Sequence, residues 1–444
     1  MKFFWRYLPS KLSPGGLGWG LVAGSGIMLA GMACTFLVGV LLARGLGAAG
    51  YGLYGVVMAL VAGAIVPAKM GLPQLLTREV SALTAHHDWD SARSLINWSA
   101  WRSMVASCVV VALVFPLSAA LMPSVAGHLP ALWLGAALVP LVVANGLGGG
   151  VLRGMQHVVL GQLPDTLVRP GVHALLLGGL YWCSVTLTPT LAMLSGVLAA
   201  GTGAVLVLVA IRRLLPRSEA RIPAGLNERA WLASAYPMAI TEGLQVLQSQ
   251  AAIMVLALGS SLGSTGLFRV AASASALVAA PMTLFNLVAA PNVARLHALG
   301  SRRELQRVLG WVAAGMTLCV SGLSLPFMLA GERVMTLLFG QEFAAAAPVM
   351  RVLCLGFIGS SCFGASGMLL NMCGLHRHVT RASLLSLSVL TVALLLTVPV
   401  WGALGAAWSA SGALVLWQAV LWVVGRTHLG LDSSVAGLFS ETRE

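Results

Sequence analysis

The chain consists almost entirely of long apolar stretches separated by short polar gaps, and about twelve stretches of 20 residues or more follow one another. A bilayer core about 30 Å thick needs roughly 20 apolar residues of helix, because hydrocarbon offers no water to unpaired backbone groups. Each stretch is therefore predicted to be a transmembrane helix. The predicted spans are 17–43, 50–75, 98–122, 130–152, 168–188, 191–211, 231–258, 263–290, 308–330, 345–372, 380–399 and 402–425.

Basic residues fall in alternate gaps between these spans. Of the 26 Lys and Arg residues, 21 precede the first span or follow an even-numbered one, such as Arg153 and Arg169 after span 4. The opposite gaps hold Arg44 and Arg333 only. Because basic loops translocate poorly, this asymmetry predicts that both termini lie on the cytoplasmic side.

The net charge of +13 follows from the same loops. A basic nucleic-acid-binding protein clusters its charge on a charge-rich soluble domain, whereas only 9% of these residues are charged and 58% are hydrophobic. We therefore expect the cationic loops to face anionic membrane lipids, and we expect no nucleic-acid partner.

The longest gap, roughly 212–230, is short and rich in arginine, so the sequence predicts no soluble domain. It divides the chain into an N-lobe (1–215) with six spans, a basic cytoplasmic linker (216–230), a C-lobe (231–426) with six spans, and a cytoplasmic tail (427–444). The predicted fold class is an all-α integral membrane protein with about twelve transmembrane helices in two lobes.

An internal repeat occurs at the external turn after the first span of each half. The turn reads LGAAGYGLY over 46–54 and LGSTGLF over 262–268, and its Gly-Leu-aromatic triplets lie 214 residues apart. Glycine suits such turns because it adopts φ values that other residues resist. Six spans per half give both halves the same orientation, which predicts a pseudo-two-fold axis along the membrane normal and suits alternating access.

These turns also carry a family resemblance. The segments LARGLG (42–47), YGLY (51–54), GLP (71–73) and the pair Arg78 and Glu79 resemble the start of Wzx-type polysaccharide transporters, the lipid-linked oligosaccharide flippases. Further similar features follow in order: Pro281 and Pro291, the basic segment 302–304, the segments 338–340, Phe343 and Pro348, and GALGAA at 402–407. The resemblance covers about residues 17–425.

The resemblance implies the two-lobed, twelve-helix fold of the multidrug, oligosaccharidyl-lipid and polysaccharide exporter superfamily. It implies a flippase, not an enzyme, that moves an undecaprenyl-diphosphate-linked oligosaccharide across the bacterial inner membrane. The glycan would be an O-antigen, capsule or exopolysaccharide unit, and other polysaccharide-assembly proteins would be further partners. The resemblance implies no catalytic residue, metal or cofactor.

A diphosphate and its sugars cannot cross hydrocarbon unaided, so a flippase needs a hydrated, cationic cavity between its lobes. Ionisable residues inside spans are the candidates for its lining. Arg269 lies roughly 9 Å below the outer end of span 8, where it could pair with a diphosphate oxygen or extend to the outer headgroups. Lys69 in span 2 has the same two alternatives, and for it the inner headgroups are favoured.

Glu242 is the acid placed deepest in a span, about 15 Å from the inner end of span 7. Gln245 and Ser249 follow at i+3 and i+7, so the three form a polar stripe that we expect to face the cavity. Glu242 could carry a coupling proton, bind Na⁺, hold Arg269, or simply pack by a hydrogen bond. No nucleotide-binding motif is present, so transport energy would come from H⁺, Na⁺, membrane potential or product use.

Arg78 and Glu79 at the inner end of span 2 are predicted to cap or gate that end. Three other functions remain. A drug exporter of the same fold would use acids in its N-lobe, and spans 1 to 6 contain no clear internal Asp or Glu. A membrane polysaccharide polymerase or ligase would need a substantial outer loop, and a structural scaffold would leave Glu242 and Arg269 unexplained.

Overall fold

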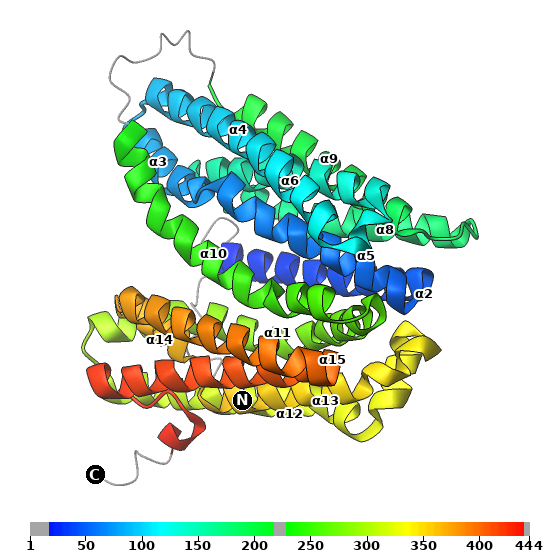
Figure 1. The fold of residues 1–444 in the computed structure, drawn as a ribbon. Coiled ribbons are helices and arrows are strands. Elements are labelled where there is room, and N and C mark those ends of the chain that lie inside the picture. Colours follow the sequence, from blue (N-terminus) through cyan, green and yellow to red (C-terminus); the bar gives the residue numbers. More distant parts are fainter. Residues whose placement is uncertain (1–16, 217–227, 439–444) are drawn as a thin grey trace.

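The structure is a computed structural model, and it describes residues 17–216 and 228–438 (Figure 1). Within these ranges every regular element is a helix. The N-terminal basic residues used to orient the chain, most of the predicted linker 216–230 and the end of the predicted tail lie outside the described residues.

The helices fall into two successive groups. The first contains α2 (Leu17–Lys69), α3 (Leu72–Ala85), α4 (Trp89–Leu121), α5 (Pro123–Ala126), α6 (Leu129–Gly154), α7 (Val158–Leu163), η1 (Pro164–Val168), α8 (Arg169–Trp182) and α9 (Pro189–Leu214). The second contains α10 (Glu228–Gly259), α11 (Leu262–Ala298), α12 (Arg302–Phe339), η2 (Gln341–Ala346), α13 (Ala347–Cys362), α14 (Ser366–Met372), α15 (His376–Leu429) and η3 (Val435–Leu438).

Two of these helices are pairs of crossings joined at a glycine. Gly47 in α2 has φ 67° and Gly402 in α15 has φ 53°, a left-handed conformation that breaks the helix. Division at these glycines gives two crossings each from α2 and α15. The segments α7, η1 and α8 together form one crossing, and α13 and α14 form another. Each described half then contains six crossings. The predicted all-α fold of about twelve transmembrane helices is confirmed.

Several predicted boundaries differ from the structure, and two of the differences bear on the candidate site. Span 2 was expected to run to residue 75, but its helix ends at Lys69, and α3 begins a separate helix at Leu72. Met70 and Gly71 have φ values of 52° and 70°, which stop the first helix. Span 5 is predicted over 168–188, but its helix starts at Val158. Polar residues in 162–169 interrupt the apolar run, so hydropathy does not detect the first part of this helix.

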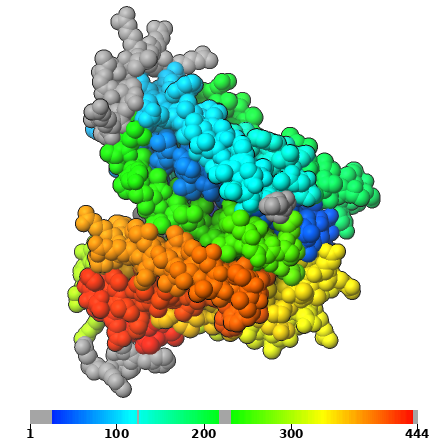
Figure 2. Space-filling view, viewed as in Figure 1, coloured from blue at the N-terminus to red at the C-terminus, as the bar shows by residue number. Residues whose placement is uncertain are grey.

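The crossings form two bundles whose axes converge at one end (Figure 1). The converging end carries η2 and the part of α2 that it contacts, and the opposite end carries α3, α14 and the arginine-rich segments. We call the second the inner end, following the charge asymmetry of the sequence. Helix α10 runs obliquely between the bundles, and Figure 2 shows the two halves in contact along their middle.

Candidate functional site

The two halves meet at their outer ends through the repeated turn. A Cβ atom added to Gly52 of α2 would overlap the carbonyl oxygen of Leu262, and one added to Gly266 of α11 would overlap that of Ala48. The two glycines are 214 residues apart, and so are the residues that they contact, Ala48 and Leu262, which is the spacing of the sequence repeat. The repeat therefore pairs with itself across the pseudo-two-fold axis, and glycine is required at both crossing points.

Arg269 lies directly below this crossing and contacts its own repeat counterpart. Its counterpart at a spacing of 214 is Gly55, whose missing side chain leaves the space that the Arg269 methylenes fill. The guanidinium carbon lies 5.8 Å from the ring centre of Tyr51 and 5.6 Å from that of Tyr54. These cation–π contacts hold Arg269 at the lobe junction rather than at the outer headgroups.

No acid in the part of the chain that the structure describes forms an ion pair with Arg269. Among the described residues, the buried Nε of Arg269 has no hydrogen-bond partner. The neighbouring hydroxyl of Tyr51 is 3.0 Å from Oγ of Ser273, so the tyrosine is fixed across the junction by a hydrogen bond to α11. The site thus presents a cation on a rigid aromatic platform.

Arg169 belongs to the same site, although the sequence analysis placed it in a cytoplasmic gap. It lies 11 residues along the helical segment that begins at Val158, or roughly 16 Å at helical rise, and so near the middle of the bilayer. Helices α8 and α11, which carry Arg169 and Arg269, both pack on α2, the helix of Tyr54. Each lobe therefore supplies one arginine from a helix that packs on α2.

The spacing of polar residues in the sequence indicates that Arg169 lies within a helix. Gln162, Asp165 and Arg169 recur at i, i+3 and i+7, the same helical spacing as the stripe that begins at Glu242. Hydropathy alone starts span 5 at residue 168, because these polar residues dilute the apolar run before it. The five residues of η1 form a π-turn, a feature frequent at functional sites, and it alters the helical register between Asp165 and Arg169.

At the inner end, Lys69 and Glu242 form an ion pair between the lobes. Lys69 Nζ lies 3.7 Å from Glu242 Oε1, and their side chains are 16% and 26% exposed. The lysine side chain also lies against Gly146 of α6, so it does not extend to the inner headgroups. Glu242 therefore pairs with Lys69 and not with Arg269. Arg269 contacts α2 at Gly55, which precedes Lys69 by 14 residues, or roughly 21 Å at helical rise.

The polar stripe on α10 is only partly engaged. Glu242 lies 17 residues from the outer end of α10 and 14 residues from its first described residue, roughly 25 Å and 21 Å, so it lies well inside the helix. Gln245 and Ser249 are exposed, and the Ser249 hydroxyl donates to the backbone carbonyl of Val246 at 2.9 Å. Their part in lining a cavity stays a prediction.

Arg78 and Glu79 contact each other on the exposed side of α3. Nη2 of Arg78 donates to Oε1 of Glu79 at 2.6 Å, and no described residue of the C-terminal half forms an ion pair with either. Their gating role stays a prediction.

The inner ends of the lobes touch through α10 instead. Gly71 packs on the backbone of α10 near Ala235. Trp98 of α4 and Trp231 of α10 lie 5.3 Å apart between ring centres. Both contacts lie in the inner half of α10, so this part of the helix leans on the N-lobe.

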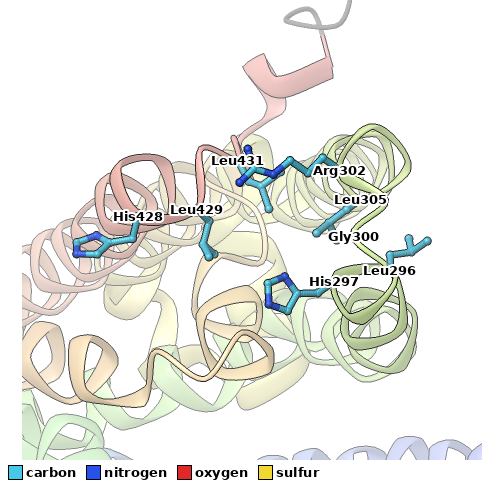
Figure 3. Close-up of a pocket in the computed structure, with 8 residues that line it drawn as sticks. All are labelled: Leu296, His297, Gly300, Arg302, Leu305, His428, Leu429 and Leu431. Atoms are coloured by element: carbon cyan, nitrogen blue, oxygen red, sulfur yellow. The ribbon is translucent and has the colours of Figure 1, made fainter.

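A small pocket of about 150 Å³ lies elsewhere, at the inner end of the C-lobe. Figure 3 shows His297 and Leu429 facing it from two helices, whereas His428 points away. Its lining shares no residue with the lobe junction. In the described part of the chain, no three His, Cys, Asp or Glu side chains gather as a metal site would require.

Comparison with known proteins agrees with this architecture. The model of the family described as "Polysaccharide biosynthesis protein" matches residues 18–297. No curated protein shows significant similarity to the chain.

Several solved structures have the same fold. An inward-facing multidrug resistance MATE family transporter of the MOP superfamily aligns with a TM-score of 0.75 at 13% identity, over 92% of this chain and 98% of that one. The lipid II flippase MurJ, in an inward closed conformation, aligns at 0.69 and 10% identity over 90% and 87%. An outward-facing MATE transporter aligns at 0.62 and 15% identity over 92% and 95%.

The matched family segment covers more than half of the sequence, and the fold matches cover nearly all of it. The apolar helices make the chain a multi-pass membrane protein. Its fold is that of these transporter structures. The chain belongs to the polysaccharide biosynthesis protein family.

Proposed function

We propose that this protein is a flippase that carries a polyprenyl-diphosphate-linked oligosaccharide across the bacterial inner membrane by alternating access. The family match and the flippase among the structures of the same fold support this function. The observation that carries it is the position of Arg269 on Tyr51 and Tyr54 at the lobe junction, with Arg169 on a helix of the other lobe that packs on the same α2. This arrangement is suited to an anion with two phosphate groups.

The chemistry of the substrate fits these two arginines. A guanidinium binds phosphate oxygens through charge-assisted hydrogen bonds, which are stronger and more directional than neutral ones. In the membrane interior a lone arginine is costly, so a transient anionic partner offsets that cost during each cycle. A diphosphate between the lobes would also connect both of them, because each lobe supplies one cation.

The rest of the substrate has different requirements. The sugars need polar surroundings, to which Lys69, Gln245 and Ser249 are the proposed contributors, whereas the isoprenoid tail can stay in lipid. Arg78 and Glu79 are the proposed inner gate.

The ion pair at the inner junction bears on coupling. If H⁺ or Na⁺ drives transport, protonation or Na⁺ binding at Glu242 has to replace its interaction with Lys69. We propose that this exchange loosens the contact of α10 with α2. Glu242→Gln is then expected to abolish the dependence of transport on an ion gradient, and an unchanged dependence rejects this role.

One observation favours a second function, ion-coupled drug export. The sequence analysis found no acid inside spans 1 to 6, but Asp165 lies seven residues into the segment that begins at Val158 and is exposed. A drug exporter of the same fold would use an N-lobe acid of this kind. Asp165 has cationic neighbours, however, because its charge acts on Arg153 and Arg169 follows at i+4. One acid beside two arginines favours an anionic substrate over a cationic drug.

The test is mass spectrometry of the lipid-linked sugar pool in cells that lack the protein. We expect one polyprenyl-diphosphate glycan to accumulate and a plasmid copy to relieve the accumulation. A plasmid carrying Arg269→Ala should fail to relieve it, and the matched variant Arg213→Ala should succeed, because Arg213 lies on the exposed end of α9. An unchanged pool together with raised drug sensitivity would favour the exporter.

A further inference from the structure

A groove inside the N-lobe is separate from the lobe junction. It has a volume of about 640 Å³ and lies between α4, α6 and α9. Its walls are mostly apolar, with Met104, Leu147 and Leu208 among them. None of the residues that line it belongs to the Arg169, Arg269 and Tyr54 cluster, so the proposed substrate site does not account for it.

The groove exists because two of its helices pack on the third without packing on each other. Helix α6 approaches α9 closely: the Asn145 amide donates to the Ala200 carbonyl at 3.1 Å, and Gly203 faces Asn145. Helix α4 contacts α6 along its other side, but it has no extended contact with α9 over the described residues. Helix α6 therefore forms a floor on which Ala144 is exposed.

Charge is confined to the inner mouth of the groove. Arg93 near the start of α4 and Arg212 in the last turn of α9 line that end, and Arg212 is exposed. The Arg93 guanidinium also donates to the Pro216 carbonyl at 3.0 Å, which fixes its position at the mouth. Further along, the lining is apolar apart from Asn97, Ser103 and Ser107.

We infer that this groove binds an anionic phospholipid of the inner leaflet, with its phosphate at Arg212 and Arg93 and one acyl chain between α4 and α9. The cationic mouth and apolar body match the two parts of such a lipid. The mouth lies at the level of the arginine-rich loops, where inner-leaflet headgroups are located. The bound chain fills the space that separates α4 from α9 and so joins the two helices.

The binding test uses the purified full-length protein and native mass spectrometry. Protein in detergent is titrated with phosphatidylglycerol, which is anionic, and with phosphatidylethanolamine, which is zwitterionic. We expect preferential retention of phosphatidylglycerol, and Arg212→Gln should weaken it about fivefold, because a basic residue near an anionic surface contributes about that factor. Arg213→Gln is the matched control, since Arg213 is the next residue and does not line the groove.

A second variant tests the chain-binding part without changing charge. Ala144→Phe places a ring in the groove from an exposed floor position, so phosphatidylglycerol retention should fall while both arginines remain. Equal losses in the Arg212 and Arg213 variants, or full retention in Ala144→Phe, would overturn the proposal. Displacement of phosphatidylglycerol by polyprenyl phosphate at equal concentration would also overturn it, since the groove would then belong to the transported lipid.

Discussion

The outer and inner lobe junctions are built in opposite ways. At the outer junction two copies of one turn pack backbone against backbone, with Gly52 and Gly266 in reciprocal contact. At the inner junction the contact is asymmetric, because the described contacts run from α10 to α2, α3 and α4. Its ion pair is long, at 3.7 Å, and partly exposed.

This difference indicates which junction resists opening in the described conformation. Close backbone packing tolerates no added atom and gains dispersion energy over many atom pairs. A partly exposed ion pair contributes little, because solvent screens it. We therefore expect the outer junction to hold the lobes together while the ion pair at the inner junction exchanges at low cost.

The largest effect is expected from filling the glycine crossing. Gly52→Ala and Gly266→Ala each force the helices apart, because the new Cβ meets a backbone carbonyl. Overpacking costs roughly 1–3 kcal/mol, so transport should fall roughly tenfold or more in either variant. Relief of the lipid-linked sugar pool in complemented cells measures it.

Gly63→Ala is the matched control for the glycine crossing. Gly63 lies in the same helix with nothing within 4 Å of its Cβ position, so this variant should keep full transport. Equal activity in all three glycine variants would refute the proposed rigidity of the outer junction.

The next largest effect on transport is expected from Arg269, which lies below the glycine crossing. Arg269→Ala removes charge-assisted hydrogen bonds to the diphosphate, each worth about 1.5–3 kcal/mol, so transport should fall about tenfold to a hundredfold. Arg269→Lys keeps the charge but loses the planar fork, and it should retain partial transport. Full activity of both variants would remove Arg269 from the site.

A smaller effect is expected at the inner junction. Lys69→Met and Glu242→Gln each remove one partner of the ion pair, and a double-mutant cycle on unfolding measures their coupling. For a partly exposed pair we expect a coupling of about 0.2–1 kcal/mol. A coupling of several kcal/mol would mean that the inner junction is as firmly held as the outer one.

The smallest effect on transport is expected at Asp432, whose described hydrogen-bond partners all belong to the second half of the chain. Burial alone would raise the pKa of Asp432, but hydrogen bonds from Ser434 and Trp422 outweigh it and lower this pKa below its usual value. The attachment of this segment to Gln306 of α12 should therefore be stable at neutral pH. It should weaken as the pH falls below the ordinary Asp range and through the lowered pKa.

Hydrogen exchange of residues 430–438 against pH measures the strength of this attachment. Asp432→Asn should remove the pH dependence and leave transport unchanged. A loss of transport in this variant would show that the segment communicates with the lobe junctions.

The sequence predicted the architecture because long apolar runs and alternating basic gaps are local properties. It also identified the turn at Gly52 and Gly266, since both copies keep one spacing. It missed the mid-membrane position of Arg169, because polar residues in 162–169 dilute the apolar run that hydropathy detects. It could not assign Glu242 to Lys69, since that pairing depends on how α10 crosses α2.

The central claim is tested most directly by purified protein in liposomes that contain a fluorescent polyprenyl-diphosphate glycan, with an impermeant quencher added outside. The account predicts that the quenched fraction rises from about half toward completion when the wild-type protein is present, and that Arg269→Ala leaves it near the protein-free level. Quenching that is the same with and without the wild-type protein would contradict the flippase function.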